Sequence, residues 1–273
     1  MDKIIEYMLA EDEGFGDITS NSVVDESLEV NAYIISKDEG ILAGMNIAKD
    51  IFTNYGVHVD FWLKDGCEIH KKDLLMSVKG NARTILLLER TVLNLIMRMS
   101  GVATASSEFV KLVGGKVKIA GTRKTSPAIS KFDKYALQIG GADTHRFSLD
   151  DMVLIKDNHI ATCASPLDAL KKAQSNVSFS KKIEIEVETL NDAVECVRQK
   201  ADIVMLDNMS SDEVAEVILE LEKQNIRENS LIEVSGGINQ ENILEYVDLG
   251  VDIISIGALT HNVRSLDFSL KLD

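Results

Sequence analysis

The sequence predicts an α/β protein whose larger part is a barrel of repeated βα units. From about residue 116, short runs rich in Val and Ile alternate with amphipathic stretches, the pattern of βα units around a parallel sheet. The expected strands are KVKIAGT, MVLIKD, KIEIEVE, DIVMLDN, LIEVSGG and DIISIGA. Polar residues follow most of these runs, and in a barrel such strand ends meet at one rim, where enzymes place their chemistry. An open doubly wound sheet would also bind a ligand at strand ends and stays an alternative.

Amphipathic segments between these strands are expected to form helices that cover the sheet. They are LDALKKA, LNDAVECVRQK, DEVAEVILELEKQ and ENILEYVDLG. The third begins with Ser210 and has Glu213 three residues later, the spacing of a capping box that satisfies free amides of a first helical turn.

The first part of the chain has a different sequence pattern. Between residues 23 and 88, short β-rich runs are separated by turn signals, which predicts a sheet-containing first domain. A helix of about residues 84–113 follows. We therefore place a first domain at 1–113 and the barrel at 114–263, and expect residues 264–273 to pack back on the first domain.

Composition limits the function. The 273 residues carry a formal net charge of −15, which argues against a nucleic-acid partner because phosphates repel an acidic surface. No apolar run is long and uncharged enough for a signal peptide or a membrane span. Three widely spaced cysteines, Cys67, Cys163 and Cys196, suit reduced packing residues rather than a metal site. A cytoplasmic enzyme is expected.

A set of cationic residues follows the first two barrel strands. Arg123 and Lys124 end one strand, His145 and Arg146 lie in the next connection, and Lys156 ends the second strand. Arg can grip a carboxylate or phosphate with two hydrogen bonds, whereas Lys supplies a compact charge. If these residues converge, they form a pocket for a ligand with several negative charges.

Acidic residues at other strand ends indicate a divalent cation. Glu186 and Asp207 offer the oxygen ligands with which Mg²⁺ binds beside substrate phosphates. Glu184 and Glu188 lie on the same face of their strand as Glu186, because side chains alternate with period two. Spacing alone therefore leaves open which of the three faces the metal.

A glycine turn after the fifth strand predicts a phosphate site. Ser235, Gly236 and Gly237 precede a helix expected to begin near Asn239, whose first amides would point at the anion. Gly257, near the end of the next strand, could complete the site, since barrels often bind phosphate on their last two loops.

These segments together resemble the quinolinate phosphoribosyltransferases, also called nicotinate-nucleotide pyrophosphorylases (carboxylating). The resemblance is carried, in family order, by EDEGFGDITS, ERTVLNLIMRMSGVAT, TRKTSP, KYALQIGGADTHR, DMVLIKDNHI, EIEVETL, VMLDN, VSGGI and VDIISIGALTH. It implies an N-terminal α/β sandwich domain and an incomplete, seven-stranded TIM-like barrel, in a homodimer with shared active sites or a higher oligomer built from it. It also implies the reaction of quinolinate with phosphoribosyl pyrophosphate and Mg²⁺ to nicotinate mononucleotide, pyrophosphate and carbon dioxide, in NAD biosynthesis.

The resemblance assigns roles to residues. The expected quinolinate binders are Arg123, His145, Arg146 and Lys156, with Arg90 reaching in from the partner subunit. Lys124, Glu186 and Asp207 are similar to the residues that hold the phosphoribosyl donor and its metal, and together with Lys156 form the expected catalytic set. Ser235, Gly236, Gly237 and Gly257 match the family's phosphate loops.

Two departures from the family pattern affect the loops. Pro127-Ala128-Ile129-Ser130 replaces the usual Pro-Gly-Leu-Arg, and Ala142-Asp143-Thr144 replaces a glycine and an asparagine before His145. Three rivals remain: a nicotinate phosphoribosyltransferase, the relative found with molybdate-transport genes, and a non-catalytic phosphate-binding module. The complete cationic set favours the quinolinate enzyme, since a monoacid ring needs fewer carboxylate partners.

Overall fold

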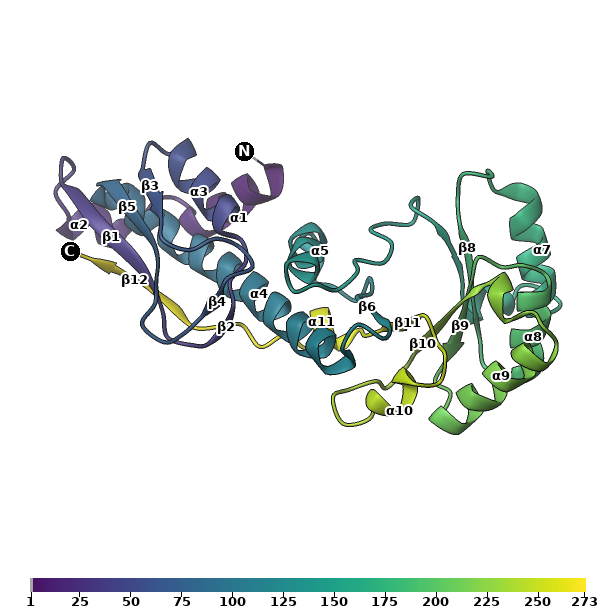
Figure 1. The fold of residues 1–273 in the computed structure, drawn as a ribbon. Helices are drawn as coiled ribbons and strands as arrows, with labels where there is room; N and C mark the ends of the chain where they lie inside the picture. The colour runs from purple at the N-terminus through teal and green to yellow at the C-terminus, as the bar shows by residue number, and fades with distance from the viewer. Residues whose placement is uncertain (1) are drawn as a thin grey trace. The chain divides into compact units, whose positions relative to one another are not determined.

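The computed structural model describes residues 2–273, which form two compact units (Figure 1). The first unit comprises the chain up to Ser107, together with Thr125–Gly141 and Leu259–Asp273. The second comprises Glu108–Lys124 and Ala142–Ala258.

The second unit is built on a parallel sheet of six strands, which are the six runs expected from the sequence. The strands are β6 (Lys118–Ala120), β7 (Val153–Ile155), β8 (Ile183–Val187), β9 (Ile203–Asp207), β10 (Leu231–Ser235) and β11 (Ile253–Ser255). Their order is β6-β11-β10-β9-β8-β7, so the last strand in the chain pairs with the first. A parallel bridge between Ala120 and Asp143 extends the sheet beyond β6. The seventh strand implied by the family resemblance is thus reduced to this bridge, and the barrel stays open between it and β7.

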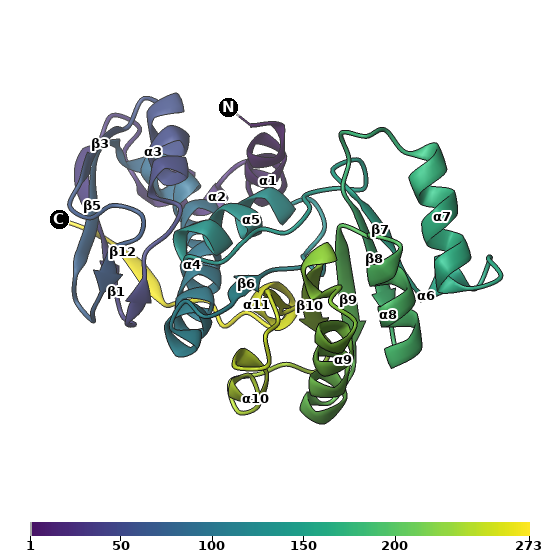
Figure 2. The ribbon, with the colours of Figure 1, turned by 45° about the vertical axis from the view of Figure 1, so that its right-hand side comes forward.

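Helices alternate with the strands of this sheet, and α7 and α8 pack against it. They are α6 (Asp157–Ile160), α7 (Pro166–Asn176), α8 (Leu190–Arg198), α9 (Ser211–Lys223) and α10 (Leu244–Val247), with a 3₁₀ turn at Arg227–Asn229. Figure 2 shows α8 and α9 beside β8 and β9 on one side of the sheet. The predicted capping box is present: the Ser210 side chain accepts from the Glu213 amide, and the Glu213 carboxylate accepts from the Ser210 amide.

Strand β8 shows how the sheet separates core from site. All five of its residues are buried. Because side chains alternate, Ile183, Ile185 and Val187 share one face, and Glu184 and Glu186 share the other. Burying each branched side chain contributes about 1.5–3 kcal/mol, so the apolar face fixes the register and turns both carboxylates toward the barrel interior.

The first unit contains an antiparallel sheet of order β12-β1-β5-β3. Its strands are β1 (Glu29–Ser36), β3 (His58–Phe61), β5 (Leu74–Asn81) and β12 (Phe268–Leu272), and a small sheet pairs β2 (Gly40–Ile41) with β4 (Glu68–Ile69). β12 pairs along β1 from Ala32–Leu272 to Ser36–Phe268, so the C-terminal tail is an edge strand of this sheet. Its helices are α1 (Lys3–Glu13), α2 (Ile18–Val23), α3 (Met45–Asn54) and α5 (Ser130–Ile139), together with most of α4 (Ala82–Val113) and of α11 (Ala258–His261), both of which extend into the second unit.

The boundary expected at residue 113 differs from this division, because residues 125–141 group with the first unit. An ion pair joins α5 to α4 within the first unit. Asp133, fully buried on α5, accepts from Arg98 Nε at 2.8 Å and from Arg98 Nη2 at 2.9 Å. Arg98 Nη2 also donates to the carbonyl of Thr260 at 2.9 Å, which fixes the start of the C-terminal segment.

No helix within residues 2–273 combines the length and the apolar character that crossing a lipid bilayer requires.

Candidate active site

A cavity of about 610 Å³ lies at the carboxyl ends of the barrel strands. Residues from the ends of all six strands line it, as the strand-end polarity predicts. The lining residues are Thr122, Arg123, Lys124, His145, Arg146, Leu149, Leu154, Lys156, His159, Glu186, Met205, Asp207, Asn208, Ser235, Gly236, Gly237 and Ser255.

The cavity brings together the five cationic residues identified in the sequence. Arg123 and Lys124 are exposed in the loop after β6, whereas His145 and Arg146 are partly buried. Burial lowers the pKa of Arg146, and the positive charge of Arg123 lowers it further. Two guanidinium groups that repel each other in one cavity are stabilised by an anion that contacts both.

Lys156 lies between β7 and α6, and its ammonium group is paired with the Glu186 carboxylate. The Lys156 amide donates to His159 Nδ1 at 3.0 Å, which orders the short turn that carries this lysine. His159 thus contributes to the loop as well as to the cavity wall.

Glu186 and Asp207 form an acidic side of the same cavity. Burial raises the pKa of Asp207, and the neighbouring Glu186 charge raises it further, while Lys156 opposes the rise. Two carboxylates that repel each other beside open space fit the donor set that Mg²⁺ prefers. Of the three glutamates on this face of β8 and its end, Glu186 lines the cavity, Glu184 is fully buried, and Glu188 is exposed.

The glycine turn after β10 contacts the loop after β9. Gly236 has φ +96°, and a Cβ there would lie 2.2 Å from Asn208 Oδ1 and 2.8 Å from the Asn208 amide nitrogen. Asn208 also donates through Nδ2 to Asp207 Oδ2 at 2.6 Å. A single asparagine, Asn208, which tolerates its own φ of +56°, therefore links the glycine turn to the acidic side of the cavity.

The helix expected near Asn239 begins instead at Leu244. The Asn239 side chain accepts from the amides of Glu241 and Asn242, at 2.8 and 3.3 Å, and so forms a polar turn in place of the first helical residues. The predicted helix start near Asn239 is thus wrong, and Gly236 and Gly237 are the residues of this loop that line the cavity. Gly257 follows β11 but is not among the residues that line the cavity.

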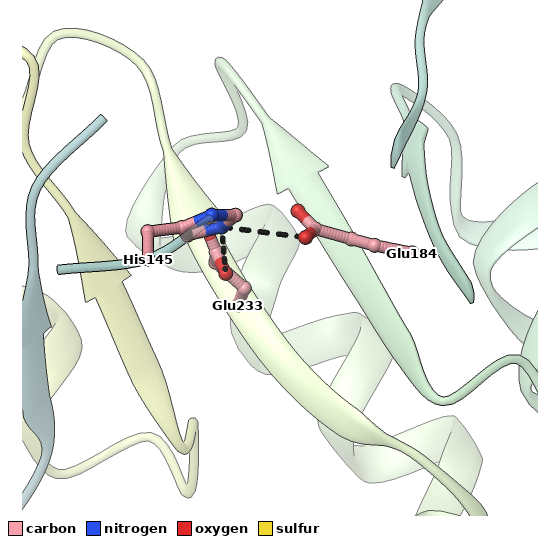
Figure 3. Close-up of side chains that lie close together, drawn as sticks. All are labelled: His145, Glu184 and Glu233. Atoms are coloured by element: carbon pink, nitrogen blue, oxygen red, sulfur yellow. Dashed lines mark ion pairs between the residues drawn. The ribbon is translucent and has the colours of Figure 1, made fainter. Parts of the chain in front are cut away.

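Deeper in the barrel, His145 faces two buried glutamates (Figure 3). Its Nε2 lies 3.3 Å from Glu184 Oε2 on β8 and 3.4 Å from Glu233 Oε2 on β10. Burial disfavours charge on the ring, but these two carboxylates outweigh it and raise the pKa of His145 to about 10. Burial also raises the pKa of Glu184. Glu233 was not predicted as a site residue, although a glutamate inside the apolar strand LIEVS is a signal for an inward-facing polar group.

Two models of known families match the chain and together cover most of it. Residues 17–100 match the N-terminal domain of quinolinate phosphoribosyl transferase, and residues 102–271 match its C-terminal domain. The chain belongs to the quinolinate phosphoribosyltransferase family.

Individual members of the family are similar over nearly the full length. A probable nicotinate-nucleotide pyrophosphorylase (carboxylating) of Methanocaldococcus jannaschii is 46% identical over 275 residues, which cover 99% of this chain and 96% of the relative. The crystal structure of NadC from Streptococcus pyogenes has a TM-score of 0.93 at 35% identity, covering 100% of this chain and 96% of that one. Human nicotinic acid phosphoribosyltransferase is 14% identical with a TM-score of 0.65, and the match covers 100% of this chain and 74% of the human chain. This likeness shows a shared fold alone.

The departures from the family pattern have local structural consequences. Ala128 stands where the family usually has glycine and adopts φ +68°. Asp143 bridges to β6 through its backbone, and its Oδ1 accepts from the His145 amide at 2.8 Å. Arg90 was expected to reach the quinolinate site of a partner subunit. It is exposed on α4 in the first unit and is not among the residues that line the cavity of its own chain.

Proposed function

We propose that this chain transfers the phosphoribosyl group of phosphoribosyl pyrophosphate to quinolinate and releases nicotinate mononucleotide, pyrophosphate and carbon dioxide, a step of NAD biosynthesis. The observation that carries the proposal is one cavity with a cationic side, an acidic side and a glycine turn. Quinolinate is a dianion and the donor carries phosphate and pyrophosphate, so the two substrates need these three features together.

The cationic side suits quinolinate. Arg123 and Arg146 offer planar forks for its two carboxylates, and Lys156 adds a point charge. Arg90 of a partner subunit completes this set in the proposal, which requires a homodimer. Binding would release Lys156 in part from Glu186, because one ammonium group would then face two anions.

The other two sides suit the phosphoribosyl donor. Lys124, Ser235, Gly236 and Gly237 would hold its phosphate groups, with Gly257 beside them, since exposed lysines and glycine backbone allow close approach of phosphate. Glu186 and Asp207 would hold Mg²⁺, which neutralises charge on the departing pyrophosphate when it is bound.

The reaction needs positioning more than a protein nucleophile. The quinolinate ring nitrogen attacks the ribose anomeric carbon, a C–N bond forms, and the bond to pyrophosphate breaks. The nitrogen is then quaternary, and its positive charge stabilises the electron pair that stays on the adjacent carbon when the carboxylate leaves as carbon dioxide. A proton on that carbon completes nicotinate mononucleotide.

Three alternatives use the same scaffold. A nicotinate phosphoribosyltransferase would need only one carboxylate subsite, whereas this cavity holds Arg123, Arg146 and Lys156 together. The molybdate-linked relative and a non-catalytic phosphate-binding module would not need the complete set of cations and carboxylates. A cytoplasmic location, expected from the composition, stays a prediction.

A product assay tests the proposal. Purified protein is mixed with Mg²⁺ and phosphoribosyl pyrophosphate, and quinolinate or nicotinate is offered in parallel. Nicotinate mononucleotide should form from quinolinate, should fail to form after chelation of Mg²⁺, and should need more Mg²⁺ in Glu186→Gln and Asp207→Asn. Formation of nicotinate mononucleotide from nicotinate instead would reassign the substrate. No product from either acid would refute the proposed phosphoribosyltransferase activity.

A further inference from the structure

We infer that the second unit holds a second ligand site, at the amino ends of the barrel strands, for a small zwitterion with an ammonium group at one end, a carboxylate at the other and a hydrocarbon chain between them. The ammonium group binds the buried carboxylate of Glu233, and the ligand's carboxylate binds Lys118 and Lys182 at the mouth of the site. The inference concerns a different cavity from the candidate active site and does not depend on the proposed function.

A cavity of about 500 Å³ lies at the end of the barrel opposite the candidate active site. Residues two positions apart on one strand, which point the same way, divide between the two cavities. Ile203 lines this second cavity and Met205 lines the active-site cavity, and Ile253 and Ser255 divide in the same manner. The residues that line the second cavity all belong to the second unit and are Lys118, Ala120, Asp143, His145, Arg146, Asp151, Met152, Ser180, Lys182, Ile203, Leu231, Glu233, Asp252 and Ile253.

Two buried carboxylates lie at the inner end of this cavity, where barrels usually pack branched apolar side chains. Glu233 lines the cavity, and Glu184 lies close to it across the barrel interior (Figure 3). Both are fully buried, and within residues 2–273 none of their four oxygens accepts a hydrogen bond. Buried acceptors without donors cost free energy, so the cavity favours a ligand that brings N–H donors and positive charge.

The charge balance at the inner end also favours a cationic group. His145 Nε2 forms ion pairs with Glu184 and Glu233, at 3.3 and 3.4 Å, and the two carboxylates raise the pKa of His145 to about 10. One imidazolium charge thus faces two carboxylates. An ammonium group fits better than a metal ion, because a metal ion would bind Nε2 only after loss of the proton that the raised pKa retains.

The cavity walls suit a hydrocarbon chain. Between the buried carboxylate and the mouth, the apolar side chains of Met152, Ile203, Leu231 and Ile253 line the space. A cavity of this volume is much larger than a single ion needs. Contact with these side chains would remove apolar surface of the ligand from water.

The mouth provides free cations but no free carboxylate. Each acidic residue there already accepts hydrogen bonds: Asp252 from Arg227 and the Ile232 amide, Asp143 from the His145 amide, and Asp151 from the Phe147 amide. Lys118 and Lys182 are exposed, and within residues 2–273 neither side chain forms an ion pair or hydrogen bond. The group bound at the mouth is therefore an anion, and the ligand carries opposite charges at its two ends.

Strand geometry gives the length of the ligand. Lys182 precedes Glu184 by two residues, and Leu231 precedes Glu233 by two. A strand rises about 3.3 Å per residue, so the mouth lies about 7 Å from the carboxylates along the strands. A suitable probe is 6-aminohexanoate, in which five methylene groups separate the ammonium group from the carboxylate.

Calorimetric titration of the full chain measures binding of the probe. We expect one 6-aminohexanoate per chain with a Kd of about 1 mM or lower, which is within reach of a ligand of this size. Glycine is too short to reach both ends, and hexylamine and hexanoate each lack one charge, so all three should bind at least about tenfold more weakly. Absence of probe binding at about 10 mM would overturn the inference and leave water as the occupant. Equal affinity for hexylamine or hexanoate would also overturn it.

Matched variants place the probe in the cavity. Glu233→Gln keeps the side-chain size but removes the charge, and Lys118→Met with Lys182→Met removes the cations at the mouth. Each should weaken binding of 6-aminohexanoate about tenfold or more. The control Lys116→Met removes an exposed lysine that is already paired with Asp248, and should bind the probe like the wild type.

Two further results would overturn the inference even if the probe binds. Arg123 lines only the active-site cavity, so Arg123→Met should bind 6-aminohexanoate with unchanged affinity. Loss of binding in this variant would place the probe among the cations of the active site instead. A tightly bound divalent ion, one per chain and lost in Glu233→Gln, would show that the buried carboxylates hold a metal rather than an ammonium group.

Discussion

The ammonium group of Lys156 is paired with the carboxylate of Glu186 across the carboxyl ends of the neighbouring strands β7 and β8. The pair joins the cationic and acidic sides of the cavity. Its side chains are unequally exposed, with 42% of Lys156 and 10% of Glu186 open to solvent. The lysine can therefore turn toward a bound anion more easily than the glutamate can move.

Lys156→Met tests the cationic side. We expect kcat/KM for quinolinate to fall by about a hundredfold, because a charged contact to the substrate is lost and Glu186 is left without its counter-ion. Lys172→Met is the matched control, since Lys172 forms an exposed pair with Asp168 on α7. Steady-state kinetics of both variants measure the effect, and a folded Lys156→Met enzyme of normal activity would remove this residue from the site.

Gly236→Ala tests the phosphate turn. An added Cβ would collide with Asn208, and the φ of +96° is strained for alanine, so the turn must shift. The KM for phosphoribosyl pyrophosphate should rise about tenfold or more. Gly237→Ala is the control, because its Cβ would meet open space although its φ of +62° is also positive. Equal kinetics of the two variants would show that contact with Asn208 does not shape the site.

Ala128→Gly tests the strain introduced by the first departure from the family pattern. At φ +68° alanine costs about 1–2 kcal/mol relative to glycine, and the greater freedom of glycine in the unfolded chain offsets part of the gain. We expect the free energy of unfolding to rise by about 0.5–1 kcal/mol in urea titrations. Ala142→Gly, at a buried position without positive φ, should lower it instead. A loss of stability in both variants would contradict the strain.

Cys196 gives a pH dependence of stability. Burial raises the pKa of its thiol from 9.0 to about 12. Between these values the unfolded state loses the proton and the folded state keeps it, so stability falls as pH rises. From pH 9 to 10.5 the wild type should lose about 2 kcal/mol more than Cys196→Ala. Urea titrations at both pH values measure the difference, and identical slopes for the two proteins would show that the thiol is not buried as described.

The sequence predicted the parallel sheet well because each strand carries its own signal. Val- and Ile-rich runs ended by polar residues occur six times, and all six are strands. The position of α5 was not predictable in this way. It groups with the first unit, where its Asp133 pairs with Arg98 of α4, and these two residues are 35 positions apart and have no shared sequence pattern.

The candidate site shows the same limit. Strand-end position was enough to bring Arg123, Lys156 and Asp207 to one cavity. Glu233 lies in the middle of its strand, where its partner His145 cannot be read from spacing. The assignment of Glu186 rather than Glu184 to the cavity likewise required the depth of each residue in the barrel, because both share one face of β8.

The most direct measurement of the central claim is the stoichiometry of carbon dioxide release. Quinolinate labelled in the carboxylate next to the ring nitrogen is incubated with phosphoribosyl pyrophosphate, Mg²⁺ and the purified protein. We predict one labelled carbon dioxide for each nicotinate mononucleotide formed, and neither product when phosphoribosyl pyrophosphate is omitted. Nucleotide that retains the label, or carbon dioxide release without nucleotide, would contradict a phosphoribosyl transfer coupled to decarboxylation in this cavity.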